Sequence, residues 1–108
     1  MVNRSIALIV RKYLSNLQKQ DISITYGVVF GSHARGEANQ WSDIDLLVVS
    51  PRFDQKLVRE DLNLLCRIAA RTDSRIEPIP VGQGQFLTDD SSAIIEIARR
   101  EGEIISLA

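Results

Sequence analysis

Two short apolar runs separated by a short polar segment constrain the fold of this chain more than any other feature. The first run, residues 24–30, is rich in β-branched and aromatic residues, as strands are, and is followed by Gly31 and Ser32. After ten further residues, Asp43 and Asp45 lead into the second run, which reads LLVV. Because so short a connection cannot hold a helical crossover, we expect two antiparallel strands. This pairing would place the end of the first strand beside the start of the second.

Three other segments have the pattern of amphipathic helices. Apolar residues recur there at helical spacing, which predicts helices over about residues 3–19, 54–71 and 91–100. Cys66 lies among apolar residues of the second segment, so we expect it to be a core thiol. The apolar tail, residues 104–107, has no assigned element. It either packs on the core or contacts a partner.

A third strand is predicted over residues 75–81, which have strand composition but include Pro78 and Pro80. Prolines two apart remove backbone donors on one side only, which fits an edge strand. The preceding helix is long enough to return the chain, so this strand should run parallel to the second. Gly82 and Gly84 then predict a loop. The expected fold is therefore α/β (α+β), with a mixed sheet of about three strands packed by about three to four helices.

Composition is that of an ordinary globular domain. With 108 residues, of which 44% are hydrophobic and 25% charged, the chain suits a single domain over residues 1–108. No apolar stretch approaches the ~18 residues of a membrane helix. The N-terminal segment has only a five-residue apolar stretch, too short for a signal peptide. We therefore expect a cytoplasmic protein that needs no membrane.

Charged residues are scattered along the chain and sum to a net charge of -1. The sequence has no basic stripe of the kind that neutralises a nucleic-acid backbone, so we expect no long nucleic acid as a partner. Binding a single nucleotide needs far less positive charge, and composition allows it.

The two aspartates indicate a metal site. Side chains alternate along a strand, so Asp43 and Asp45 point to the same face, about 7 Å apart. Apolar neighbours make two like charges costly unless cations neutralise them, and Mg²⁺ prefers such oxygen ligands together with substrate phosphates. A pair of such ions could bind the attacking and leaving oxygens of a phosphoryl transfer. Glu77, if it reaches this face, would complete the second site or take the proton of the attacking hydroxyl.

The glycine-serine turn indicates a phosphate site. Gly31 allows the backbone to approach a phosphate closely, and Ser32 can add its hydroxyl and amide, especially if a short helix starts there. Arg35 lies one turn further on, and its planar guanidinium matches a phosphate in two-point contact. His33 has no partner residues at metal-ligand spacing and is expected near the nucleotide. Trp41 is either a cap over the loop or a platform on which a base stacks.

Each motif alone has an ordinary explanation, and their combination favours an active site. A glycine-serine turn often only reverses the chain, and an Asp-x-Asp pair is often a solvated strand end. Arg35 could be surface charge, and Glu77 could be solvated or paired with Arg75. Asp43 and Asp45, however, enter an otherwise apolar strand and lie a short distance in sequence from the glycine-serine turn. Neither a simple chain reversal nor a solvated strand end requires that combination.

In these residues the chain resembles the minimal nucleotidyltransferases (MNT proteins) of the polymerase-beta-like nucleotidyltransferase superfamily. The family pattern is Gly-Ser, about ten residues, Asp-x-Asp and a later acidic residue, which Gly31, Ser32, Asp43, Asp45 and Glu77 match. The resemblance implies a palm-like nucleotidyltransferase fold. It also implies transfer of a nucleoside monophosphate, usually AMP from ATP, with Mg²⁺ held by the aspartates. The glutamate at the third position departs from the aspartate of many relatives.

The resemblance also implies a partner. Minimal family members typically act as antitoxins beside a HEPN ribonuclease toxin, to one of whose tyrosines they attach AMP. A chain of this size has no room for a second substrate domain, so the acceptor site would come from a partner, in a hetero-oligomer with the toxin.

Three hypotheses therefore remain open. The first is a protein adenylyltransferase that modifies a toxin. The second is a nucleotidyltransferase fold that silences the toxin by occlusion, with little catalysis. The third is a small-molecule nucleotidyltransferase, acting for example on an aminoglycoside, which would need a homodimer to form the acceptor cleft.

Overall fold

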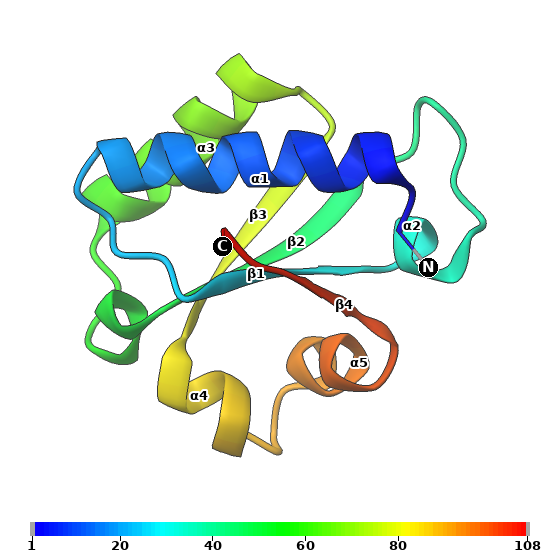
Figure 1. Ribbon diagram of the computed structural model, residues 1–108. Helices are drawn as coiled ribbons and strands as arrows, with labels where there is room; N and C mark the ends of the chain where they lie inside the picture. The colour runs from blue at the N-terminus through cyan, green and yellow to red at the C-terminus, as the bar shows by residue number, and fades with distance from the viewer. Residues whose placement is uncertain (1, 108) are drawn as a thin grey trace.

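The computed structural model of the chain describes residues 2–107 and shows a mixed sheet between two layers of helices (Figure 1). In chain order its elements are α1 (Arg4–Lys19), β1 (Tyr26–Phe30), α2 (Ser32–Arg35), β2 (Ile44–Ser50), the 3-10 helix η1 (Pro51–Asp54), α3 (Arg59–Thr72), β3 (Ile76–Gly82), α4 (Gln83–Thr88), α5 (Ala93–Glu101) and β4 (Glu103–Ile105). The expected α/β fold is confirmed. Over residues 2–107 the sheet has four strands, one more than expected.

The strand pairing follows the predicted topology. The strand order is β3-β2-β1-β4, with β1 antiparallel to β2 and β4, and β2 parallel to β3. The amide of Ile44 donates to the carbonyl of Arg75 at 2.8 Å, so every second residue of β3, starting from Arg75, pairs inward. Pro78 and Pro80 are therefore the outward-pairing residues of an edge strand, where a missing donor breaks no ladder bond.

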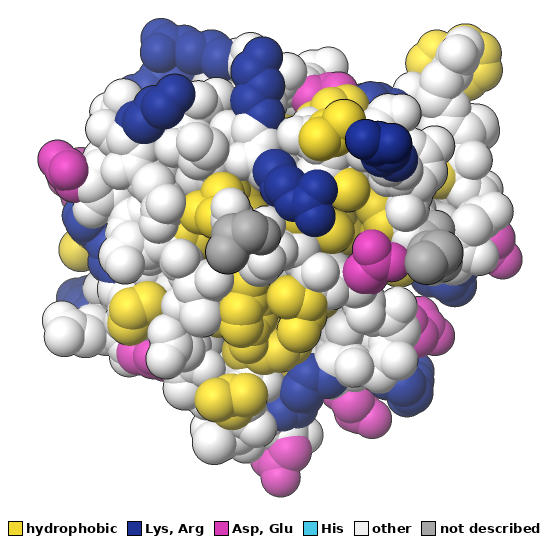
Figure 2. All heavy atoms as spheres, viewed as in Figure 1, with side chains coloured by type: hydrophobic (Ala, Val, Ile, Leu, Met, Phe, Trp, Pro, Cys, Tyr) yellow, Lys and Arg dark blue, Asp and Glu magenta, His cyan; other side chains and the backbone are white. Residues whose placement is uncertain are grey.

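Helix α1 forms where a capping residue precedes a regular apolar stripe. The side chain of Asn3 accepts hydrogen bonds from the amides of Ser5 and Ile6 and so satisfies the first turn. One face of the helix is buried against the sheet and α3. Its other face is basic, because α1 contains four basic and no acidic residues. Figure 2 shows Lys and Arg side chains spread over the upper part of the molecule, where α1 lies.

Alternation along the strands divides the core in two. One set of buried side chains packs under α1 and α3, and it includes Val29, Leu46 and Val48. The other set packs against α4 and α5, and it includes Leu47 and Val49. Since side chains two apart share a face, the residues that precede Leu47 at even spacing lie on the α4 and α5 side. This fixes the face on which Asp45 of β2 lies.

The loop predicted at Gly82 and Gly84 is wrong, because Gly82 ends β3 and caps helix α4, and Gly84 lies in the first turn of that helix. Asp54, from η1, accepts hydrogen bonds from the amides of Gly84 at 3.0 Å and Gln85 at 3.1 Å. These bonds lower the pKa of the Asp54 carboxyl. A Cβ on Gly82 would lie 2.0 Å from Oδ1 of Asp54, so glycine is needed for this approach. A capping group about thirty residues away in sequence thus stabilises the helix start.

Two other expectations need correction. Helix α3 starts at Arg59 rather than near residue 54, because η1 occupies the first part of the predicted segment. Cys66 is exposed, since the buried face of α3 passes through Leu65 and Ile68 instead. Of the two alternatives for the apolar tail, packing on the core is confirmed: its first two residues lie in β4, which pairs with β1, and Ile105 is buried in the core. Within residues 2–107 no helix has the length and apolar character to cross a membrane.

Candidate active site

The predicted phosphate turn and the two aspartates among the predicted metal ligands line one cavity of about 500 Å³ at the end of β1. Its lining consists of Phe30, Gly31, Ser32, Arg35, Ser42, Asp43, Asp45 and Ile97. Antiparallel pairing of β1 and β2 brings these residues together, since Phe30 lies opposite Asp45 in the register. Helix α5 contributes Ile97 as an apolar wall. Five of the six residues predicted for the site therefore meet in one place.

Gly31 adopts a backbone conformation that other residues avoid. Its φ is 74° and its ψ is -150°, a region open almost only to glycine. A Cβ at this position would lie 2.2 Å from Oδ2 of Asp45. The turn thus brings the backbone directly against the carboxylate. A short helix, α2, starts at the next residue, Ser32.

Asp43 and Asp45 form an electrostatically strained pair. Asp45 is half-buried within β2, whereas Asp43 is exposed and directly precedes the strand. Burial raises the pKa of the Asp45 carboxyl, and the charge of Asp43 raises it further. His33 and Arg35 act in the opposite direction. The site therefore favours added positive charge beside Asp45.

Arg35 is the cationic side chain of the cavity lining. Its Nε donates to Oε1 of Glu37 at 2.5 Å, and its Nη1 lies 3.8 Å from Oε2 of Glu101 in α5. The hydrogen bond to Glu37 raises the pKa of the guanidinium, so Arg35 stays charged. Its side chain is 45% exposed, and both contacts are surface ion pairs that a phosphate can replace at low cost.

Glu77 lies beside the site and outside the cavity lining. The parallel register pairs it with Asp45, so both side chains are on the same face of the sheet. Its side chain is exposed. Over residues 2–107 no three His, Cys, Asp or Glu side chains are close enough to hold one metal ion together. Its role as a third ligand stays a prediction.

Sequence reasoning missed the contacts that hold the loop before Asp43. His33 Nε2 lies 3.2 Å from the carbonyl oxygen of Ser42, and Nη1 of Arg75 donates to the carbonyl of Gln40 at 3.2 Å. No sequence signal pairs residues so far apart. Trp41 is 78% exposed, so it does not cover the loop as a cap.

The residues present fit a divalent cation. Asp43 and Asp45 supply carboxylate oxygens and Ser32 a hydroxyl, which are the hard ligands that Mg²⁺ prefers. Burial, and then the charge of Asp43, raise the pKa of the Asp45 carboxyl, so holding it ionised costs free energy. A cation bound there would remove that cost.

Comparison with known proteins agrees with this geometry. Residues 9–101 match the nucleotidyltransferase domain family. No curated protein matches the chain significantly. A solved structure of a protein assigned as a nucleotidyltransferase from Sulfolobus solfataricus has a TM-score of 0.64 and 16% identity, covering 91% of this chain and 77% of that chain.

Two further solved structures with this fold come from toxin–antitoxin systems. One is a toxin–antitoxin complex with AMP-PNP, with a TM-score of 0.60 and 18% identity over 91% of this chain and 73% of that chain. The other is the MntA–HpeT pair in a mutant form with two Asp-to-Glu substitutions, with a TM-score of 0.59 and 16% identity over the same shares. At such identities these likenesses concern the fold alone. The match over residues 9–101 covers most of the sequence, and the chain therefore belongs to the nucleotidyltransferase domain family.

Proposed function

We propose that this protein is a Mg²⁺-dependent adenylyltransferase that transfers AMP from ATP to a tyrosine of a HEPN-type toxin and thereby acts as its antitoxin. The observation that carries the proposal is the meeting of the Gly31 turn with Asp43 and Asp45 in one cavity. The family supplies the reaction class, nucleotidyl transfer. The toxin–antitoxin structures with the same fold support the choice of partner.

The glycine-serine turn and Arg35 hold the triphosphate in this proposal. Gly31 lets the phosphates lie against bare backbone, and the Ser32 hydroxyl donates to a phosphate oxygen. Arg35 exchanges its contacts with Glu37 and Glu101 for a phosphate. Binding thus replaces two exposed ion pairs with a charge-assisted contact inside the cavity.

Asp43 and Asp45 hold Mg²⁺, with Asp45 as the more buried ligand. When bound, Mg²⁺ supplies positive charge that neutralises the phosphates and the leaving pyrophosphate. The tyrosine oxygen forms a bond to the α-phosphorus while the bond from that phosphorus to the oxygen bridging to the β-phosphate breaks. Glu77, beside Asp45 on the same face, takes the phenolic proton.

The acceptor comes from outside this chain. The cavity is about 500 Å³, which suits one nucleotide and leaves little room for a second substrate. The two substituted aspartates of the MntA–HpeT mutant are two positions apart, the spacing of Asp43 and Asp45. The exposed Trp41, on the loop beside the cavity, offers an aromatic contact for the partner.

The deciding experiment mixes the protein with α-labelled ATP, Mg²⁺ and the product of the adjacent reading frame. We expect label on a tyrosine of that product, and none with Asp43→Asn or Asp45→Asn. The exposed Asp90 offers a matched control, since Asp90→Asn removes a carboxylate that does not belong to the cavity lining.

Each other outcome points to a different function. Suppression of toxicity by the double aspartate variant would favour occlusion. Labelling of an aminoglycoside without a partner protein would favour a small-molecule transferase. Equal labelling by the wild type and both aspartate variants would refute the assigned site.

A further inference from the structure

Asp43 is held by less regular structure than its partner in the pair. Asp45 is fixed within the ladder of β2, but Asp43 precedes the strand and is exposed. A metal ligand in that position needs other contacts to keep its orientation. The structure has such contacts on both sides of Asp43.

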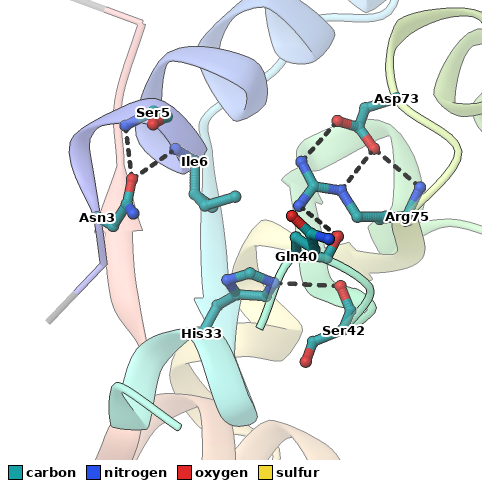
Figure 3. Close-up of polar contacts among 8 residues, drawn as sticks. All are labelled: Asn3, Ser5, Ile6, His33, Gln40, Ser42, Asp73 and Arg75. Carbon is teal, nitrogen blue, oxygen red and sulfur yellow. Dashed lines mark hydrogen bonds and ion pairs between the residues drawn. The ribbon is translucent and has the colours of Figure 1, made fainter. Parts of the chain in front are cut away.

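The peptides on either side of Asp43 are both hydrogen-bonded. Before it, the carbonyl oxygen of Ser42 lies 3.2 Å from Nε2 of His33. After it, the amide of Ile44 donates to the carbonyl of Arg75 at 2.8 Å. Because a carbonyl oxygen only accepts, His33 Nε2 carries the proton in the first bond. Figure 3 shows the imidazole of His33 pointing from α2 toward Ser42.

The segment that precedes Asp43 is also fastened at a second point. Arg75 donates to both carboxylate oxygens of Asp73, at 3.0 and 2.9 Å (Figure 3). Its Nη1 also donates to the carbonyl oxygen of Gln40. Its side chain is 25% exposed, so these bonds are partly shielded from water. Ser42 itself closes a small turn, in which its amide donates to the carbonyl of Asn39 at 3.1 Å.

We propose that His33 is a positioning residue that fixes Asp43 against the phosphate-binding turn. His33 belongs to α2, the four-residue helix that Ser32 begins. Its bond to Ser42 therefore connects the turn that holds phosphate directly to the residue before the metal ligand. The nucleotide and metal halves of the site become one preorganised unit. This inference rests on the proposed function, since it assigns Asp43 to the metal.

A structural role for the ring alone is the competing explanation. His33 and Arg75 also line a second cavity, of about 410 Å³, with the N-terminal part of α1. Filling space there would need the bulk of the ring and no donor. Two substitutions separate the explanations. His33→Phe keeps the bulk and removes the donor, whereas His33→Gln removes the ring and keeps a donor at similar reach.

The test combines two measurements on the full chain. Amide hydrogen exchange of Ser42 and Ile44, without ligand, reports how firmly the segment is held. Calorimetric titration with AMP-PNP, with and without Mg²⁺, reports the assembled site. Thr25→Val is the control, because it removes a side-chain hydrogen bond to Gln83 at the opposite end of β1.

We expect His33→Phe to speed hydrogen exchange of both amides by about tenfold. The same variant should weaken Mg²⁺-dependent binding of AMP-PNP by about 10–100-fold, which is the usual cost of losing a residue that orients a metal ligand. His33→Gln should restore both to within about threefold of wild type, and Thr25→Val should match wild type. If His33→Phe does not fold, His33→Asn replaces it, since its shorter amide cannot reach Ser42.

The proposal is overturned if the Ser42 and Ile44 amides of His33→Phe exchange at the wild-type rate. It is also overturned if their exchange is faster while Mg²⁺-dependent binding of AMP-PNP is unchanged. It is also overturned if His33→Gln is as impaired as His33→Phe, because bulk would then decide. Failure of the proposed function has another signature. In that case wild-type protein shows no Mg²⁺-dependent binding of AMP-PNP, and the exchange rates alone decide whether His33 holds the segment.

Discussion

The backbone of Gly31 and the carboxylate of Asp45 are in direct contact across the β1–β2 pair. A Cβ on Gly31 would lie 2.2 Å from Oδ2 of Asp45, well inside the sum of the van der Waals radii of carbon and oxygen. The strand register creates this contact, since Phe30 is opposite Asp45. The turn predicted to bind phosphate and the carboxylate predicted to bind metal are therefore a single structural unit. A change in one must displace the other.

Gly31→Ala should disable the site and destabilise the fold. The alanine would be strained by the positive φ and would push Asp45 aside. We expect a loss of about 1–3 kcal/mol in the free energy of unfolding, measured by urea denaturation. Binding of AMP-PNP with Mg²⁺ should also be lost.

Gly36→Ala is the matched control for this prediction. Gly36 has nearly the same φ, 73°, but nothing lies within 4 Å of its added Cβ. This substitution should cost only the backbone strain of about 1–2 kcal/mol and leave nucleotide binding near wild type. Equal loss of binding in the two variants would show that backbone strain, not contact with Asp45, matters.

Asp45→Asn should abolish transfer and yet stabilise the metal-free protein. Burial and Asp43 raise the pKa of Asp45, so the folded state binds this proton more tightly than the unfolded chain does. The ionised carboxylate therefore lowers stability at neutral pH, and this cost vanishes as the pH falls through the raised pKa. We expect a higher Tm than wild type at pH 7 and no difference near pH 3, measured by circular dichroism without Mg²⁺. A lower Tm at pH 7 would contradict this sign.

Arg35→Lys should weaken nucleotide binding without affecting stability. Lysine keeps the charge but loses the planar two-point contact, and a charge-assisted hydrogen bond contributes about 1.5–3 kcal/mol. The KM for ATP should therefore rise about tenfold or more. The free energy of unfolding should match that of wild type, because the ion pairs of Arg35 are exposed. Arg100→Lys, which alters an exposed ion pair with Glu96 at 3.7 Å, should change neither quantity.

Asp73→Asn should make the free energy of unfolding less dependent on pH in the acid range. Hydrogen bonds from Arg75 lower the pKa of Asp73, so its contribution is present above the ordinary carboxyl pKa and is lost as the pH falls through the lowered value. We expect the variant to be about 1–2 kcal/mol less stable than wild type at pH 7. In urea denaturation this gap should shrink steadily below about pH 4. A gap that stays constant down to pH 2 would show that the charge of Asp73 is not responsible.

Local patterns were sufficient for the elements that surround the site. The apolar periodicity of α1, the antiparallel pairing of β1 and β2, and the edge position of β3 all follow from short-range rules. Asp43 and Asp45 meet Gly31 because the strand register leaves no other arrangement. The position of the cavity was thus encoded in fewer than twenty consecutive residues.

Features that depend on distant contacts were not predictable. Helix α4 begins at two glycines that suggest a loop, and only the carboxylate of Asp54 explains its start. Strand β4 exists because β1 offers a free edge to a segment too short to show strand periodicity. The bond from His33 to Ser42 likewise depends on how a loop folds back, which residue type alone does not reveal.

The two prolines of β3 determine how a partner protein can approach. With Pro78 and Pro80 directed outward, the rim of the sheet lacks the amides that an incoming extended peptide would need. Recruitment by β-augmentation is therefore closed at the border nearest to Glu77. In the proposed reaction, an acceptor that reaches Asp45 would therefore enter through the cavity between β1 and α5 and would not add a strand to β3.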